Sequence, residues 1–163
     1  MRNLELKIPP PVIGLSVALL MWCAAKYGWP QALNLTFLRS AGEATSVATF
    51  LALTLALAGA AFDLSGLIAF RQHQTTINPL KPGNTSSVVT TGVYRFTRNP
   101  MYVGMLLILC GWAVYLGHLI AIVLPPLFVL LINRLQIEPE ERVLLARFGD
   151  DYAAYLSAVR RWV

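Results

Sequence analysis

The chain concentrates its charge in two segments and leaves long apolar stretches elsewhere. Of its Asp, Glu, Lys and Arg residues, four lie in residues 71–100 and ten in residues 134–163. A helix needs about 20 residues to cross the hydrocarbon core of a bilayer, with about 17 as the lower limit. The pattern therefore predicts an all-α integral membrane protein, one domain over residues 1–163, with four transmembrane helices. We expect the spans at residues 11–29, 44–70, 101–117 and 118–134.

Composition agrees with a bilayer environment. Apolar residues make up 56% of the chain and charged residues 13%, whereas a soluble domain has about 25% charged residues. A disordered chain is excluded and an ordinary soluble enzyme is disfavoured. The last two spans form one apolar run from 101 to 133, about 50 Å as a helix, which is too long for one crossing. We therefore expect a helical hairpin that turns at Gly117-His118.

The basic residues predict the orientation. With four crossings, the N-terminus, residues 71–100 and the C-terminal tail share one side, which holds most of the Lys and Arg residues. The opposite side has Arg39, with Lys26 near the outer end of the first span. The positive-inside rule makes the basic side, and both termini, cytoplasmic. Since topology explains the net charge of +5, no nucleic-acid partner is expected.

Small residues mark one face of the second span. They recur with an acidic residue at spacings of four, three, four and three, as Ala52, Ala56, Gly59, Asp63 and Gly66. Such a face lets membrane helices approach closely, and it also permits a homodimer. It predicts that Asp63 points into the bundle, where an ionisable group is by default a candidate functional residue, with a hydrogen-bonded packing role as the alternative. The two cysteines, Cys23 and Cys110, lie far apart in apolar runs and predict neither a disulfide nor a metal site.

Polar segments at 71–100 and 135–163 are expected to build the functional site. Asn99 is a favoured helix N-cap and Pro100 fits the first helical position, so a helix should begin there with free N–H groups. In the tail, Pro139 suits the start of a short helix, Gly149 its end, and Asp150 the start of a second short helix.

Two motifs together resemble a known family. The run TTGVYRFTRNPMYVG (residues 90–104) and the later run EERVLLARFGDDYAAYLSAVRRW (residues 140–162) are similar to the isoprenylcysteine carboxyl methyltransferases and phospholipid N-methyltransferases. The resemblance implies S-adenosylmethionine as methyl donor at the cytoplasmic membrane face. It also implies a lipid-like or prenylated acceptor that arrives from the bilayer, and membrane lipids as neighbours. The expected location is a bacterial inner membrane.

The motif residues suit such a donor chemically. Arg98 and the helix start at Asn99-Pro100 can bind a carboxylate, because a helix N-terminus favours anions. Glu140 and Glu141 can accept hydrogen bonds from an ammonium or from ribose hydroxyls. The expected cofactor-binding residues are Gly92, Tyr94, Arg98, Asn99, Pro100, Tyr102, Gly104, Glu140 and Glu141, and the expected catalytic residues are Arg95 and Asp63.

Several alternatives stay open at this point. Arg95 and Arg98 could be membrane-edge anchors, and the glutamates could be ordinary acids of a first helical turn. The carboxyl methyltransferases have His where this chain has Asn99, which leaves the acceptor class undecided. A nicotinamide-dependent membrane reductase and a non-catalytic membrane subunit are the competing functions.

Overall fold

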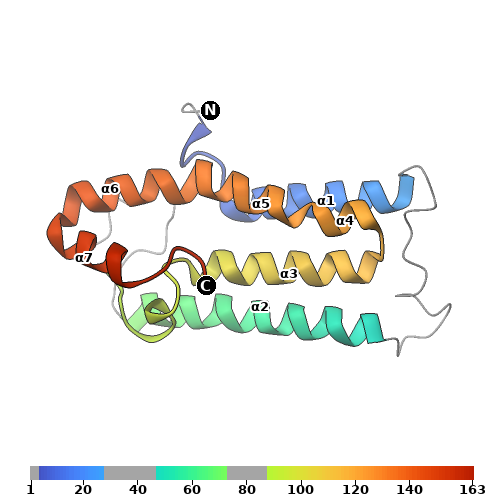
Figure 1. Cartoon of the computed structure of the whole chain (residues 1–163), viewed down its shortest axis with the longest axis horizontal. Helices are drawn as coiled ribbons and strands as arrows, with labels where there is room; N and C mark the ends of the chain where they lie inside the picture. The colour runs from blue at the N-terminus through green and yellow to red at the C-terminus, as the bar shows by residue number, and fades with distance from the viewer. Residues whose placement is uncertain (1–3, 28–46, 73–87) are drawn as a thin grey trace.

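The computed structural model describes residues 4–27, 47–72 and 88–163, and no strand occurs in this part of the chain (Figure 1). Residues 73–87, half of the polar segment predicted over 71–100, therefore lie outside the described residues. The elements are α1 (Pro10–Tyr27), α2 (Val47–Gln72), the 3-10 turn η5 (Gly92–Arg95), α3 (Pro100–Leu116), α4 (Leu119–Val123), α5 (Pro125–Ile132), the π-helical turn η6 (Asn133–Ile137), α6 (Glu138–Phe148) and α7 (Asp150–Ala158).

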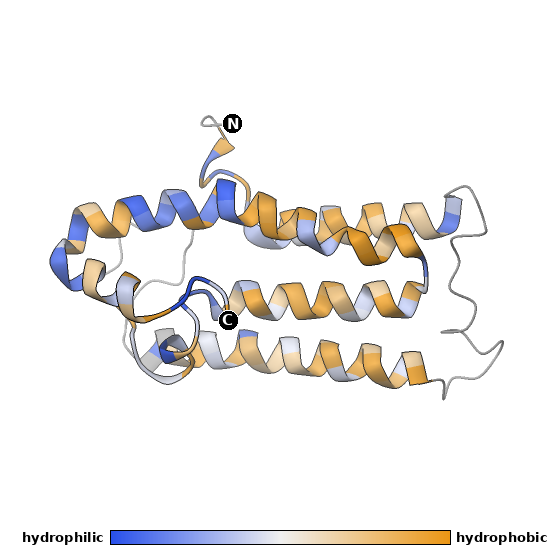
Figure 2. Ribbon diagram, in the orientation of Figure 1, coloured by the Kyte–Doolittle hydropathy of each residue, from blue (hydrophilic) through white to orange (hydrophobic). Residues whose placement is uncertain are grey.

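Helix length and apolarity confirm a membrane protein. Three described helical stretches are long and apolar enough to cross a bilayer, namely Pro10–Tyr27, Val47–Ala69 and Leu119–Phe148. Helix α3 is also apolar but has 17 residues, so its crossing stays a prediction. Hydrophobic residues cover most of the helices, whereas hydrophilic residues gather at the end formed by α6 and α7 (Figure 2).

Helix α3 lies between α2 on one side and the layer of α1, α4, α5 and α6 on the other (Figure 1). The main core joins α1, α3 and α5, where Val17, Met21, Phe128 and Ile132 are almost completely buried. The indole N–H of Trp112 donates to the Ala18 carbonyl of α1 at 3.2 Å.

Helices α2 and α3 are in close contact along the predicted small-residue face. A Cβ atom at Gly59 would lie 2.5 Å from the Gly104 carbonyl oxygen, and one at Gly111 would lie 2.7 Å from the Ala52 carbonyl oxygen. Farther along, Gly66 lies against Met101. The sequence-based prediction of this contact face is confirmed, because side chains at these glycines would force the two backbones apart.

The hairpin turn also forms where it was expected. Gly117 ends α3 in the left-handed conformation, with φ of 58°, and its N–H donates to the Ala113 and Val114 carbonyls. Such a conformation favours glycine because a Cβ atom would be strained there. The fully buried His118 then caps α4, since its Nδ1 accepts from the Ile120 N–H at 3.3 Å.

The tail forms the two short helices that were predicted, α6 with Pro139 in its first turn and α7, but α6 continues from the helix before it. Pro139 does not start a separate short helix, because Ile132, Asn133, Ile137 and Glu138 all have right-handed helical backbones. The helical path therefore runs from Leu119 to Phe148 through a π turn, past the predicted end of the fourth span at residue 134. Gly149 ends this path, as predicted, and α7 forms the one separate short helix of the described tail.

Candidate functional site

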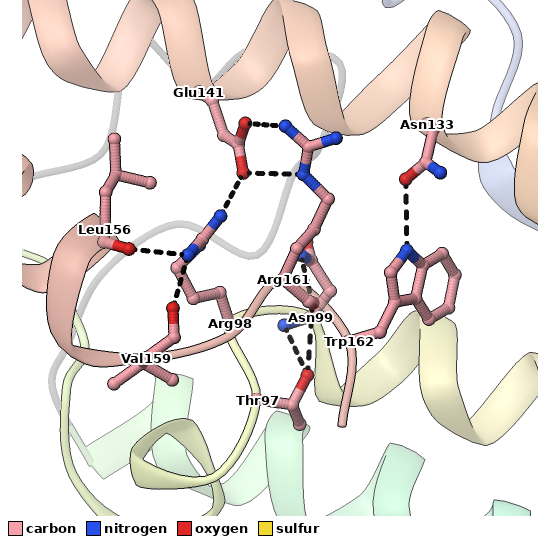
Figure 3. A network of polar contacts seen from close by, with 9 residues as sticks. All are labelled: Thr97, Arg98, Asn99, Asn133, Glu141, Leu156, Val159, Arg161 and Trp162. Carbon is pink, nitrogen blue, oxygen red and sulfur yellow. Dashed lines mark hydrogen bonds and ion pairs between the residues drawn. The ribbon is translucent and has the colours of Figure 1, made fainter.

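Polar groups from three parts of the chain meet at one end of the bundle. The turn η5 and the start of α3 bring residues 92–104, α6 brings the two glutamates, and α7 with the following residues folds back across them (Figures 1 and 3). The two motifs that carry the family resemblance therefore lie in contact, although 36 residues separate Gly104 from Glu140.

Glu141 lies at the centre of an ion-pair cluster with Arg98 and Arg161 (Figure 3). Its Oε1 accepts from Arg98 Nη2 at 2.8 Å and from Arg161 Nε at 3.1 Å, and its Oε2 accepts from Arg161 Nη2 at 2.5 Å. The side chains of Arg98 and Glu141 are 11% and 15% exposed, so solvent screens this pair weakly. The contact with Glu141 raises the pKa of Arg161, which stays protonated.

Arg98 also binds the end of α7 through main-chain oxygens. Its Nη1 donates to the Leu156 carbonyl at 3.0 Å and to the Val159 carbonyl, while its own backbone N–H donates to the Arg160 carbonyl at 3.0 Å. A cation is favoured at a helix C-terminus, where carbonyl groups lack helical partners. Arg98 thus holds the tail in place, and its Nε is buried without a hydrogen-bond partner among the described residues.

Asn99 and Pro100 begin α3 as the sequence predicted. The Asn99 side chain, however, does not cap the helix but donates to the Arg161 carbonyl at 2.9 Å. Buried Thr97 contributes a hydroxyl that accepts from the Asn99 N–H at 3.2 Å and donates to the same Arg161 carbonyl at 3.3 Å. The start of α3 and the tail are therefore joined through one carbonyl group.

Glu140 is in a different environment from Glu141. Its carboxylate makes no hydrogen bond or ion pair with a described residue, and it lies close enough to interact electrostatically with the hydroxyl groups of Tyr94, Tyr102 and Tyr152. All three tyrosines are buried. Burial, followed by the charge of Glu140, raises the pKa of Tyr94 well above its usual value, so this phenol stays protonated and can donate to an acceptor.

The tyrosines of α7 pack the site from the tail side. The buried Tyr155 hydroxyl donates to the Tyr94 carbonyl at 2.8 Å, and burial raises the pKa of Tyr155 to about 12. Tyr152 and Tyr155 lie with ring centroids 6.1 Å apart. The Tyr155 hydrogen bond attaches α7 to η5.

Asp63 lies on α2 against Gly104. It points into the bundle, as the small-residue face of α2 predicted. A Cβ atom at Gly104 would come within 2.2 Å of Asp63 Oδ1, and this buried oxygen has no hydrogen-bond partner in the part of the chain that the structure describes. One turn farther along α2, the Tyr94 hydroxyl approaches Gly66, at 3.7 Å from a Cβ atom placed there. The unpaired carboxyl group therefore lies next to the tyrosine end of the site.

Two predicted residues lie apart from this cluster. Gly92 has φ of 61° and is exposed, with open space around it, so its observed role is the turn that starts η5. Arg95 is exposed on η5 beside Phe96, which is 74% exposed. Neither residue contacts the ion-pair cluster in the described part of the structure.

Sequence reasoning missed Arg161, Thr97 and the carbonyl groups of the tail. Arg161 lies in the second motif, but nothing in its spacing distinguishes it from Arg160 beside it. Main-chain acceptors have no sequence signal at all, because every residue carries a carbonyl group.

Comparison with known proteins agrees with the two motifs. A family model described as phospholipid methyltransferase matches residues 47–151. An uncharacterized protein of Haemophilus influenzae is 44% identical over 63 residues, which are 39% of this chain and the whole of that protein. The protein-S-isoprenylcysteine O-methyltransferase of Schizosaccharomyces pombe is 30% identical over 95 residues, which are 58% of this chain and 40% of that enzyme. No solved structure gives a significant match.

Proposed function

Because the chain belongs to the phospholipid methyltransferase family, we propose that it transfers a methyl group from S-adenosylmethionine to a lipophilic acceptor in the membrane. The observation that carries this proposal is the Arg98–Glu141 contact at 2.8 Å. This contact holds together the two polar segments from which the predicted cofactor site is built.

The unpaired groups at this end of the bundle match the chemistry of the donor. S-adenosylmethionine carries a carboxylate, an ammonium, a sulfonium and two ribose hydroxyl groups. Within residues 4–27, 47–72 and 88–163, Arg98 Nε is a buried donor without a hydrogen-bond partner, and the Glu140 carboxylate makes no hydrogen bond or ion pair. We assign Arg98 and the start of α3 to the carboxylate, and Glu140 to the ammonium or the ribose. Tyr94 and Tyr102 would pack against the adenine ring.

The reaction places modest demands on the protein. When bound, the cofactor supplies a methyl group that is activated by the sulfonium for in-line displacement. The protein must then align the acceptor and exclude water, which it can do without a strong acid or base. The ion-pair cluster supports alignment because it fixes α3, α6 and the tail relative to one another.

Binding of S-adenosylhomocysteine to the purified protein tests the cofactor assignment. We expect the Glu140→Gln variant to bind at least tenfold more weakly, a loss of about 1.4 kcal/mol, in isothermal titration in detergent. The matched control is Glu138→Gln, because Glu138 lies on the same helix and pairs with the exposed Arg134. Absence of binding by the unchanged protein would overturn the proposal.

The acceptor can be a carboxylate, an amine or a thiol, and Asp63 helps to distinguish the first two. For an amine acceptor, the unpaired Asp63 carboxyl group would accept the proton released on methylation. We then expect Asp63→Asn to lower kcat at least tenfold with phosphatidylethanolamine and to leave S-adenosylhomocysteine binding within twofold. For a carboxylate acceptor, Arg95 would orient the anion. The Asp63→Asn variant would then methylate a prenylated cysteine as fast as the unchanged protein does.

A further inference from the structure

The helix that carries the glutamates contains a π turn just before them. Pro139 has no N–H, so it cannot donate to the Leu135 carbonyl four residues earlier, and its ring would clash with that carbonyl in a regular α-helix. The turn from Asn133 to Ile137 is wider, with the Glu138 N–H bonded to the Asn133 carbonyl five residues back. Such single π turns are frequent at functional sites.

The extra residue in this turn sets which side chain faces the site. Each residue rotates an α-helix by about 100°. In an uninterrupted α-helix, the place now held by Glu141 would be taken by Glu140, and the place of Glu140 by Pro139. The π turn is thus the feature that directs Glu141 to the two arginines and Glu140 to the tyrosines.

The segment before α1 binds this turn directly. The Leu6 N–H donates to the Leu135 carbonyl, the group that Pro139 leaves unpaired, at 2.9 Å. Leu6 has φ of 56°, a conformation that is costly for a side chain of this kind and persists only where contacts fix it. The fully buried Gln136 donates from Nε2 to the Ile8 carbonyl at 2.6 Å, so two consecutive residues of the turn are held by one segment.

Other contacts join the same turn to its surroundings. Asn133 Oδ1 accepts from the indole N–H of Trp162 at 3.1 Å (Figure 3), and Arg142 forms an ion pair with Glu5. The turn therefore lies between the segment before α1 and the segment after α7. The first segment binds Leu135 and Gln136 of the turn and Arg142 of α6, and the second binds Asn133.

We propose that Gln136 and the segment Glu5–Ile8 are positioning elements of the site. They hold the π turn open, and through it they fix the rotation of α6 and the directions of Glu140 and Glu141. The inference rests on the proposed function for its effect on cofactor binding. The geometry of the turn can be tested without that function.

Pro139→Ala is the direct test, because alanine restores the N–H that would close the turn into a regular helix. We expect the Leu6 amide to exchange faster with deuterium, since it loses its acceptor, and S-adenosylhomocysteine to bind at least tenfold more weakly. The melting temperature should be unchanged or higher, because alanine suits a helix interior better than proline. The control is Pro126→Ala, the same change at an exposed position of the same long helix.

Unchanged exchange at Leu6, or unchanged cofactor binding with faster exchange, would overturn the proposal. If the unchanged protein binds no S-adenosylhomocysteine, the proposed function fails, and the exchange measurement alone decides whether the segment holds the turn.

A second variant covers the case in which Pro139→Ala does not fold. Gln136→Met keeps the buried volume and removes the bond to Ile8. We expect a KM for S-adenosylmethionine raised at least fivefold with kcat within twofold. The control is Leu109→Ala in the same core, which should lower the melting temperature and leave KM unchanged. A Gln136→Met variant that behaves like Leu109→Ala would show a merely structural role.

Discussion

At the scale of single residues, two adjacent glutamates have different environments. Glu141 accepts from both Arg98 and Arg161, whereas Glu140 has no described partner and lies near three buried tyrosines. A helix directs consecutive side chains about 100° apart, so neighbours in sequence face different surroundings. We infer that Glu141 holds the site together and that Glu140 is left to bind a ligand.

Replacement of Glu141 should therefore affect stability. Glu141→Gln leaves the Arg98 and Arg161 guanidinium groups without a carboxylate in a weakly solvated cluster. We expect the free energy of unfolding to fall by about 2 kcal/mol, because a buried charge that loses its partner is costly. Glu138→Gln should cost less than about 0.5 kcal/mol, because its partner Arg134 is exposed. Thermal melts of both variants in detergent measure the difference, and equal melting temperatures would contradict it.

The sequence predicted which segments meet but not which atoms join them. The charges and turn signals of residues 92–104 and 140–155 were enough to bring Arg98 and the glutamates to one end of the bundle. The partners of Arg98 include the Leu156 and Val159 carbonyls, which no side chain reveals. Assignment of roles within the site therefore required the structure.

Among the helices, the sequence predicted the contact face of α2 fully and α6 only in part, because the π turn that joins α6 to α5 was not predicted. The spacing of the small residues in α2 predicts that they share one helix face, and that face contacts α3 as predicted. A proline such as Pro139 is compatible with two structures, the start of a helix or a widened turn inside a helix. In the structure, the N–H of Leu6, far away in the sequence, donates to the Leu135 carbonyl that Pro139 leaves without a helical donor, and no local pattern predicts this contact.

The close glycine contact between α2 and α3 predicts that a side chain at Gly104 lowers the stability of the protein. Gly104→Ala places a methyl group within 2.2 Å of Asp63 and 2.6 Å of the Gly59 carbonyl, so the helices must separate. We expect a loss of about 1–3 kcal/mol of unfolding free energy. Gly14→Ala is the control, because its methyl group would meet the flexible end of Met105 and the helix gains propensity. Equal melting temperatures for the two variants would contradict the prediction.

At the scale of the whole molecule, the polar site lies at one end of an apolar bundle. Three described helices are long enough to span a bilayer, and α3 lies between α2 and the other layer (Figure 1). Large apolar side chains such as Leu15, Phe50 and Leu57 are exposed on α1 and α2, which is expected where helices face lipid.

The basic residues predict an orientation in the membrane, and this prediction can be measured. Green fluorescent protein fused after Val163 should fluoresce, because we expect this end in the cytoplasm. Alkaline phosphatase fused after Gly117, at the opposite end of α3, should be active. A dark fluorescent fusion together with an inactive phosphatase fusion would reverse the predicted orientation.

The tail after α7 is recognised mainly by its main chain. Arg98 and Asn99 bind the carbonyl groups of Val159, Arg160 and Arg161, and Arg98 also binds that of Leu156 in α7. Among the described contacts of residues 159–163, Arg161 and Trp162 are the two that add side-chain bonds. Most side chains of this tail could therefore be replaced without loss of the hydrogen bonds that attach it to the polar end of the bundle. Distant relatives would then share this arrangement of the tail even where their sequences no longer align with it.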